Sequence, residues 1–176
     1  MKLKKLKFRG FYLFSFEGHK DERGSFRRHL CKDLLKKNNI NLDIKQGNLS
    51  HSFKKGTLRG FHFKKGKSNE TKIMSPITGS IFHVAIDLRK ESKTYKKTFG
   101  ITLDSKNRES IIVPPHCANA ILTLEDDTIM HYYMSDYFEE KKYSGIRYND
   151  PFWKIKWPIK PKIINFRDKN YPNFKF

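Results

Sequence analysis

Short segments in which apolar and polar residues alternate recur along most of the chain. In residues 81–88, Phe82, Val84 and Ile86 fall on one side of the alternation, and His83 and Asp87 fall on the other. Because successive side chains of a strand point to opposite faces, this pattern predicts a β-strand with two distinct faces, and we expect His83 on the inward one. Similar runs predict further strands at residues 8–16, 46–52, 57–63, 71–75, 98–103, 110–113, 120–124 and 129–135.

The segments between these predicted strands carry turn-forming residues, at 21–24, 55–56, 78–79, 104–105 and 114–115. Residues 29–37 have helical spacing instead, with Leu30, Leu34 and Leu35 forming an apolar stripe among lysines. Many short strands, one short helix and no strand–helix repetition predict an all-β fold. We expect residues 1–176 to form a single domain, an antiparallel jelly-roll (cupin-like) barrel that holds a ligand between its sheets.

The composition favours a folded protein with a basic surface. Hydrophobic residues make up 37% of the chain and aromatic residues 14%, which argues against disorder. The net charge is +19, but its lysines are spread along the whole sequence. A nucleic-acid-binding module would more often concentrate such charge in one stripe or tail, so this class is the least favoured alternative. Spread charge is typical of a solvated surface and suits an anionic substrate.

Export, membrane insertion and metal binding all lack sequence support. Cys31 and Cys117 are too few for a disulfide framework and favour a reducing compartment. The basic N-terminal segment is followed by a short apolar stretch broken by Arg9 and Gly10, so we expect no signal peptide. No apolar run approaches the length of a membrane span. The histidines, His62 included, do not have the spacing of metal ligands, so we predict no metal site. The few cysteines and the lack of a signal peptide together predict a cytoplasmic protein.

The segment 56–63 concentrates residues that carry chemistry. It contains Arg59 and His62, and Lys72 follows ten residues after His62. Arginine suits a phosphate, histidine suits proton transfer near neutral pH, and lysine suits a developing oxyanion. Under strict alternation Arg59 and His62 cannot share a face unless Gly60 introduces a bulge or bend. The combination predicts an enzyme acting on a phosphorylated small molecule.

Each of these residues also has an ordinary structural interpretation. His62 alone could be a half-buried, hydrogen-bonded histidine, Tyr132 a core tyrosine with its hydroxyl at the rim, and Asp168 a solvated carboxylate. However, Arg23, Arg59 and several other polar residues lie in strand-like or turn-like segments, where an apolar residue would be easier to bury. This favours a functional role for the set.

Six motifs, in order between about residue 14 and residue 172, resemble those of the dTDP-4-dehydrorhamnose 3,5-epimerase family. They occupy residues 21–24, 46–48, 56–63, 84–92, 145–151 and 155–158. The resemblance implies a jelly-roll isomerase that is usually a homodimer and needs no metal or organic cofactor.

The resemblance also implies roles for individual residues. In the catalytic set, the family's histidine base corresponds to His62 and its aspartate partner to Asp168. The family's lysine corresponds to Lys72 and its tyrosine acid to Tyr132. The substrate-binding set comprises phosphate-contacting arginines, polar residues and an aromatic near the nucleotide, here Arg23, Arg59, Gln46, Asn48 and Tyr137. Two pocket positions depart from the family pattern, because Asn119 replaces a histidine and His83 replaces an aspartate.

These residue types suit epimerisation next to a ketone. A 4-keto group acidifies the C–H bonds of its neighbouring carbons because the carbanion becomes an enolate. A base, an oxyanion-stabilising cation and an acid on the opposite face would then invert the carbon. We therefore expect an epimerase of a nucleotide-diphosphate-linked 4-keto-6-deoxy sugar, inverting C3, C5 or both in deoxysugar or surface-polysaccharide biosynthesis. The alternatives are inversion at C3 alone, a GDP- or CDP-linked substrate, or a non-catalytic sugar-nucleotide-binding protein.

Overall fold

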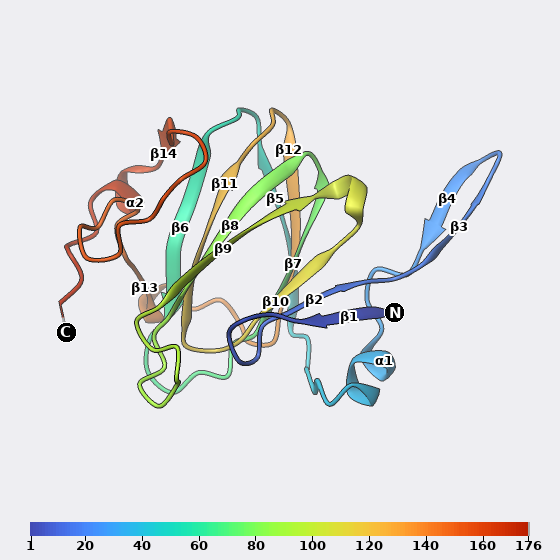
Figure 1. The fold of residues 1–176 in the computed structure, drawn as a ribbon, viewed down its shortest axis with the longest axis horizontal. Helices are drawn as coiled ribbons and strands as arrows, with labels where there is room; N and C mark the ends of the chain where they lie inside the picture. The colour runs from blue at the N-terminus through green and yellow to red at the C-terminus, as the bar shows by residue number, and fades with distance from the viewer. Residues whose placement is uncertain (176) are drawn as a thin grey trace.

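Two antiparallel sheets face each other in the computed structural model, which describes residues 1–175 (Figure 1). The first has the strand order β1 (Lys2–Lys5), β2 (Tyr12–Ser15), β10 (Ser110–Val113), β7 (Lys72–Thr78), β12 (Thr128–Met134) and β5 (Gln46–Ser52). The second has the order β13 (Tyr143–Gly145), β6 (Thr57–Lys64), β11 (Cys117–Thr123), β8 (Ser80–Asp87) and β9 (Thr98–Asp104), with β14 (Ile163–Ile164) running parallel to β6. The predicted all-β jelly-roll class is confirmed, although the sheets form an open sandwich rather than a closed barrel.

The alternation of β8 separates two hydrophobic cores. Ile81 and Ala85 are fully buried and pack with Met130 of the opposite sheet, so this face lies between the sheets. Val84 and Ile86 point to the other face, which the C-terminal part of the chain covers. Each fully buried isoleucine contributes about 1.5–3 kcal/mol to the free energy of unfolding. Contacts between buried residues of the two sheets thus hold the sheets together around the cavity between them.

The helix predicted near residues 29–37 is present, but it is shorter than predicted and a second helix accompanies it. Helix α1 spans Lys32–Lys37 and so begins three residues later than predicted. His29, which lies before it, hydrogen-bonds with His131 of β12 at 3.0 Å instead. A second helix, α2 (Phe166–Lys169), is a single turn, too short to show a helical period. It begins at Asn165, whose side-chain oxygen accepts a hydrogen bond of 2.7 Å from the backbone N–H of Asp168. This cap holds the backbone of Asp168 in the first turn of the helix.

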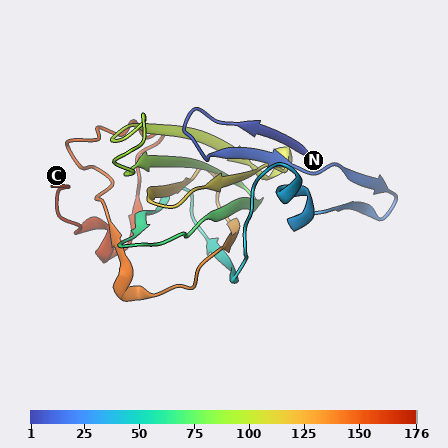
Figure 2. The ribbon, with the colours of Figure 1, turned by 90° about the horizontal axis from the view of Figure 1, so that it is seen from below.

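Strands β3 (Gly18–Asp21) and β4 (Gly24–Arg27) form a hairpin that projects from the body of the molecule (Figures 1 and 2). Most of its residues are exposed, so it shows no apolar alternation and only its turn was predicted. Two short 3₁₀ turns, η1 (Ser105–Asn107) and η2 (Glu140–Lys142), complete the elements. Within residues 1–175, no helix has both the length and the apolar character needed to cross a membrane.

Candidate active site

A cavity of about 300 Å³ opens between the two sheets, lined from both sides. β7 and β12 contribute to one wall, β6 and β11 to the other, and helix α2 lies at the rim. Polar residues singled out in the sequence meet here, namely Arg59, His62, Lys72, Asn119, Tyr132 and Asp168. The catalytic set implied by the motifs is therefore brought together from the consecutive strands β6 and β7, from β12 and from α2, which follow much later in the sequence.

A bulge in β6 places Arg59 and His62 on the same side of the strand. Where β6 pairs with β11, His62 lies opposite Asn119 and Arg59 lies opposite Ile121. Arg59 and His62 are three residues apart on β6, but their partners are only two residues apart on β11, which defines the bulge. Gly60 lies inside this bulge with φ of +123°, and a Cβ there would come within 2.6 Å of the Ala120 Cα. The backbone conformation and the close approach both require glycine.

Replacing Gly60 with alanine should therefore destabilise the protein more than a glycine substitution in open space. Gly24 provides the matched control, because its φ is +125° and a Cβ added there would meet no atom within 4 Å. Both alanine variants carry a similar backbone cost, but Gly60→Ala adds overpacking, which should lower the free energy of unfolding by about 1–3 kcal/mol more. Urea denaturation of the two variants measures this difference. Equal losses would show that the bulge can absorb a side chain.

His62 and the buried Asp168 form a hydrogen-bonded pair. His62 Nε2 lies 2.8 Å from Asp168 Oδ1, and the other carboxylate oxygen accepts a hydrogen bond of 2.9 Å from the backbone N–H of Gly60. Asp168 is completely inaccessible to solvent, whereas about a third of the His62 side chain is exposed. A carboxylate in this position favours the tautomer with its proton on Nε2, which leaves Nδ1 as a base.

Lys72 and Tyr132 face the same cavity with different hydrogen-bonding states. Lys72 Nζ lies 3.1 Å from Glu70 Oε1, so its ammonium is paired. Within residues 1–175 the Tyr132 hydroxyl has no protein hydrogen-bond partner. Burial raises the pKa of Tyr132, and the nearby Arg59 guanidinium offsets only part of that rise. Tyr132 is therefore protonated at neutral pH and free to donate.

A model of the dTDP-4-dehydrorhamnose 3,5-epimerase family matches residues 5–175. The chain belongs to this family. The dTDP-4-dehydrorhamnose 3,5-epimerase of Methanothermobacter thermautotrophicus is 35% identical over 158 residues, which cover 88% of this chain and 84% of that relative. The resemblance inferred from the motifs is thus confirmed.

Solved structures of related proteins superpose over almost the whole chain. The dTDP-4-dehydrorhamnose 3,5-epimerase from Bacillus anthracis, crystallised with TDP and PPi bound, has a TM-score of 0.94 and 31% identity over 98% of this chain and 99% of that one. NovW, a 4-keto-6-deoxy sugar epimerase from the novobiocin biosynthetic gene cluster of Streptomyces spheroides, has a TM-score of 0.89 and 27% identity over 97% of this chain and 86% of that one.

Several residues that the family resemblance implies for substrate binding lie outside the cavity lining. Gln46 and Asn48 hydrogen-bond to each other at 3.0 Å on the face of β5 that also carries the cavity residue Ser50. Tyr137 is 61% exposed, and its neighbour Phe138 lines the cavity instead.

Arg59 and Arg23, the two arginines assigned to phosphate contacts, have different surroundings. Arg59 lines the cavity, where its Nη2 donates to the His51 carbonyl oxygen at 3.2 Å. Arg23 lies in the turn of the projecting hairpin, where it pairs with Asp21 and is 83% exposed. A single chain therefore presents one of these two arginines to its own cavity.

The two positions that depart from the family pattern have different environments. Asn119 lines the cavity and its Nδ2 donates to the His62 carbonyl oxygen at 3.4 Å. His83 is fully buried between the sheets, outside the cavity lining, and neither ring nitrogen has a hydrogen-bond partner in the described residues. Burial lowers the pKa of His83 to about 3, so its ring is neutral. Within residues 1–175, no three His, Cys, Asp or Glu side chains gather closely enough to hold a metal ion.

Sequence reasoning missed Glu70 and Tyr143. Glu70 pairs with Lys72, and Tyr143 lines the cavity and donates a hydrogen bond from its hydroxyl to Glu70. A signal for Glu70 was present, because it is the only acidic residue between Asp43 and Asp87 in a lysine-rich stretch. Tyr143 had no comparable signal, since its position depends on how the loop before β13 folds back onto β6.

Proposed function

We propose that the protein inverts the configuration at C3 and C5 of a dTDP-linked 4-keto-6-deoxy sugar by proton abstraction and reprotonation. The chain is an epimerase of the nucleotide-sugar class by its family, and the relatives' names support the dTDP-linked substrate and the two carbons. The proposed proton abstraction rests on one observation. This observation is the His62–Asp168 pair, which lies in the same cavity as Lys72 and as Tyr132, whose hydroxyl has no hydrogen-bond partner among residues 1–175. A base, a cation and an acid around one cavity suit enolate chemistry.

In the proposed reaction, His62 Nδ1 removes the proton from a carbon adjacent to the keto group. The C–H bond breaks, its electron pair forms the C=C bond of the enolate, and the carbonyl electrons move onto the oxygen. The Lys72 ammonium stabilises that oxyanion, and Tyr132 delivers a proton to the opposite face of the carbon as the carbonyl re-forms. Solvent then reprotonates Tyr132, and His62 returns its proton to solvent.

The diphosphate would be bound by arginines from two copies of the chain. Arg59 lines the cavity, whereas the hairpin holds Arg23 away from it. We therefore propose a homodimer in which the hairpin of one protomer brings Arg23 to the cavity of its partner. Both cysteines, Cys31 and Cys117, are unpaired, which supports a reducing cytoplasmic setting.

Product analysis tests the proposed function directly. The protein is incubated with dTDP-4-keto-6-deoxyglucose, the product is reduced, and NMR determines the configuration at C3 and C5. Inversion at both carbons is the expected result. Inversion at C3 alone would favour the mono-epimerase alternative, and no inversion would overturn this substrate assignment.

A thermal-shift comparison of dTDP, GDP and CDP tests the nucleotide. A ligand that binds only the folded protein raises its melting temperature in proportion to the logarithm of its concentration over Kd. We expect the largest rise with dTDP. A larger rise with GDP or CDP would reassign the substrate, and binding without any turnover would favour a non-catalytic sugar-nucleotide-binding protein.

Tyr132→Phe should separate proton removal from correct reprotonation. The variant retains His62, so deuterium from heavy water should still enter the substrate, but formation of inverted product should fall by about 10²- to 10⁴-fold because the acid is lost. The ratio of deuterium incorporation to product measures this uncoupling. Tyr133→Phe is the matched control, because Tyr133 packs on the opposite face of β12. Loss of exchange and inversion together would contradict the role assigned to Tyr132.

A further inference from the structure

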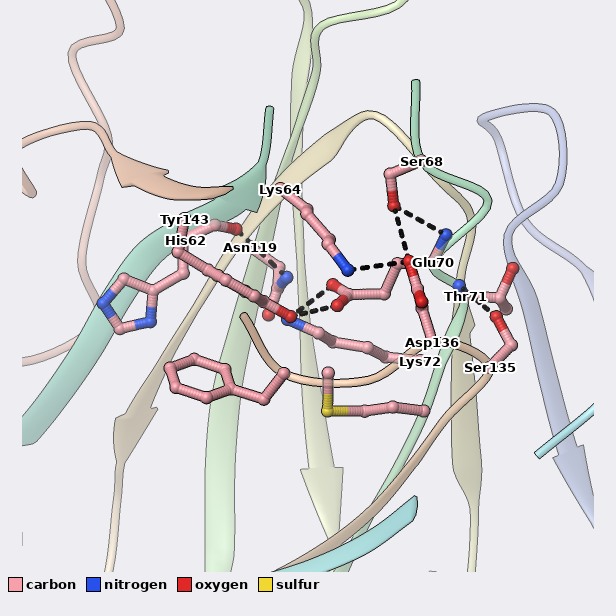
Figure 3. A network of polar contacts seen from close by, with 12 residues as sticks. His62, Lys64, Ser68, Glu70, Thr71, Lys72, Asn119, Ser135, Asp136 and Tyr143 are labelled. Carbon is pink, nitrogen blue, oxygen red and sulfur yellow. Dashed lines mark hydrogen bonds and ion pairs between the residues drawn. The ribbon is translucent and has the colours of Figure 1, made fainter. Parts of the chain in front are cut away.

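Glu70 lies behind the cavity wall in a position where a carboxylate is costly to bury. It is 8% exposed and stands outside the cavity lining, in the loop that leads into β7. A buried carboxylate is stable only when it is paired and hydrogen-bonded. Both of its oxygens are in fact occupied, because Oε1 lies 3.1 Å from Lys72 Nζ and Oε2 accepts a hydrogen bond from the Tyr143 hydroxyl (Figure 3).

Tyr143 contacts the same ammonium through its ring. Lys72 Nζ lies 5.2 Å from the centroid of the Tyr143 ring, within the range of a cation–π interaction. Burial and the hydrogen bond to Glu70 both raise the pKa of Tyr143, so its hydroxyl stays protonated and committed to the carboxylate. Lys72 and Tyr143 both line the cavity. The ammonium is therefore held by a carboxylate behind it and by an aromatic ring beside it.

A second set of polar contacts fastens the loop that carries Glu70. The backbone N–H of Glu70 donates to Ser68 Oγ at 3.1 Å, and that hydroxyl donates to Asp136 Oδ2 at 3.3 Å. Asp136 also pairs with Lys64 Nζ at 2.7 Å, and Lys64 is almost completely buried (Figure 3). The loop before β7 and the segment before β13 are thus joined behind the cavity, which limits the movement of Glu70.

We propose that Glu70 and Tyr143 are positioning residues that fix the Lys72 ammonium at the cavity wall, where it meets the oxygen on which negative charge develops. Lysine has a flexible stem and an ammonium with three donors, so without fixed partners it would occupy several positions. Pairing one donor with Glu70 and covering one side with the ring leaves the remaining donors for the substrate. The proposal rests on the proposed function, because it assigns a purpose to the oxyanion role of Lys72.

The two cavity tyrosines consequently have separate roles. The Tyr143 hydroxyl is engaged by Glu70, whereas the Tyr132 hydroxyl has no protein partner in the described residues. Tyr143 therefore serves Lys72, and only Tyr132 is available to donate a proton to the sugar. Removing the Tyr143 hydroxyl should weaken the placement of Lys72 without uncoupling exchange from inversion.

Steady-state kinetics of Glu70→Gln and Tyr143→Phe test the proposal. Glutamine keeps the shape of the side chain but removes the charge that faces Lys72. We expect kcat per folded molecule to fall by about tenfold to a hundredfold, the cost of misplacing a reacting group, with KM close to wild type. The melting temperature should also fall, because Lys72 loses its buried partner. The control is Glu125→Gln, which removes a carboxylate that accepts a hydrogen bond of 2.7 Å from Ser80 Oγ, outside both the cavity lining and this network, and should leave kcat unchanged.

The outcomes separate this proposal from the proposed function. An inactive wild-type protein would overturn the proposed function itself. An active wild-type protein with unchanged kcat in Glu70→Gln, or with a raised KM alone, would overturn the positioning role. If Glu70→Gln does not fold, Tyr143→Phe provides the test. A lower kcat with an unchanged ratio of deuterium incorporation to inverted product would support the proposal. Wild-type kinetics would contradict it.

Discussion

Replacing His62 with alanine should lower kcat for epimerisation by at least about 10²- to 10⁴-fold, the usual contribution of a general base. The imidazole is the only histidine ring among residues 1–175 that lines the cavity, and Asp168 orients it through the 2.8 Å hydrogen bond. Because Arg59, the residue proposed to bind the phosphates, remains in place, KM should change little. Initial rates at saturating substrate, with a melting curve to confirm folding, provide the measurement.

His51→Ala is the matched control for this variant. His51 also faces an aspartate, with its Nε2 3.5 Å from Asp127 Oδ1, but this pair is exposed and its side chains do not line the cavity. Its removal should leave kcat at the wild-type value. A His62→Ala variant with wild-type activity would show that another group removes the proton.

Replacing Asp168 with asparagine should lower kcat by about 10²- to 10⁴-fold while the protein still folds. Two N–H donors, from Gly60 and from His62, converge on this buried carboxylate. An asparagine amide offers one oxygen and one NH₂ group, so it can accept from only one of these donors and presents a donor to the other. The imidazole would then rotate or change tautomer, and Nδ1 would no longer be presented as a base. Parallel measurements of kcat and of the urea denaturation midpoint test this expectation.

Asp150→Asn controls for the general effect of altering a buried carboxylate. Asp150 is 3% exposed and accepts hydrogen bonds from the backbone N–H groups of Phe152 and Phe174, outside the cavity. Both variants should lose stability, because each leaves a buried N–H group poorly paired, at a cost of about 1–3 kcal/mol. Only Asp168→Asn should lose catalytic rate per folded molecule. Equal kcat values in the two variants would contradict the orienting role of Asp168.

Elements with strong local patterns could be predicted from the sequence. Strands β5 and β10 match their predicted bounds, because alternation and turn residues define them locally. The shared face of Arg59 and His62 also followed from Gly60, since only a bulge reconciles their spacing with alternation. The projecting hairpin and helix α2 were missed because neither carries a buried periodic face.

The candidate site was predictable where motifs identified residues and unpredictable where packing decides their neighbours. His62 and Asp168 are 106 positions apart, and their contact depends on how the C-terminal segment returns along β6. Glu70 and Tyr143 are 73 positions apart and meet through loops that no sequence pattern describes. Packing between the sheets likewise explains why neither ring nitrogen of His83 has a hydrogen-bond partner among the described residues.

Deuterium incorporation from heavy water tests the central claim most directly. The wild-type protein is incubated with dTDP-4-keto-6-deoxyglucose in D₂O, and mass spectrometry and NMR follow the label at C3 and C5, with His62→Ala in parallel. We predict that the wild type incorporates deuterium at these carbons and that His62→Ala does not. Absence of label from the wild-type reaction, or equal labelling by His62→Ala, would contradict proton abstraction by His62.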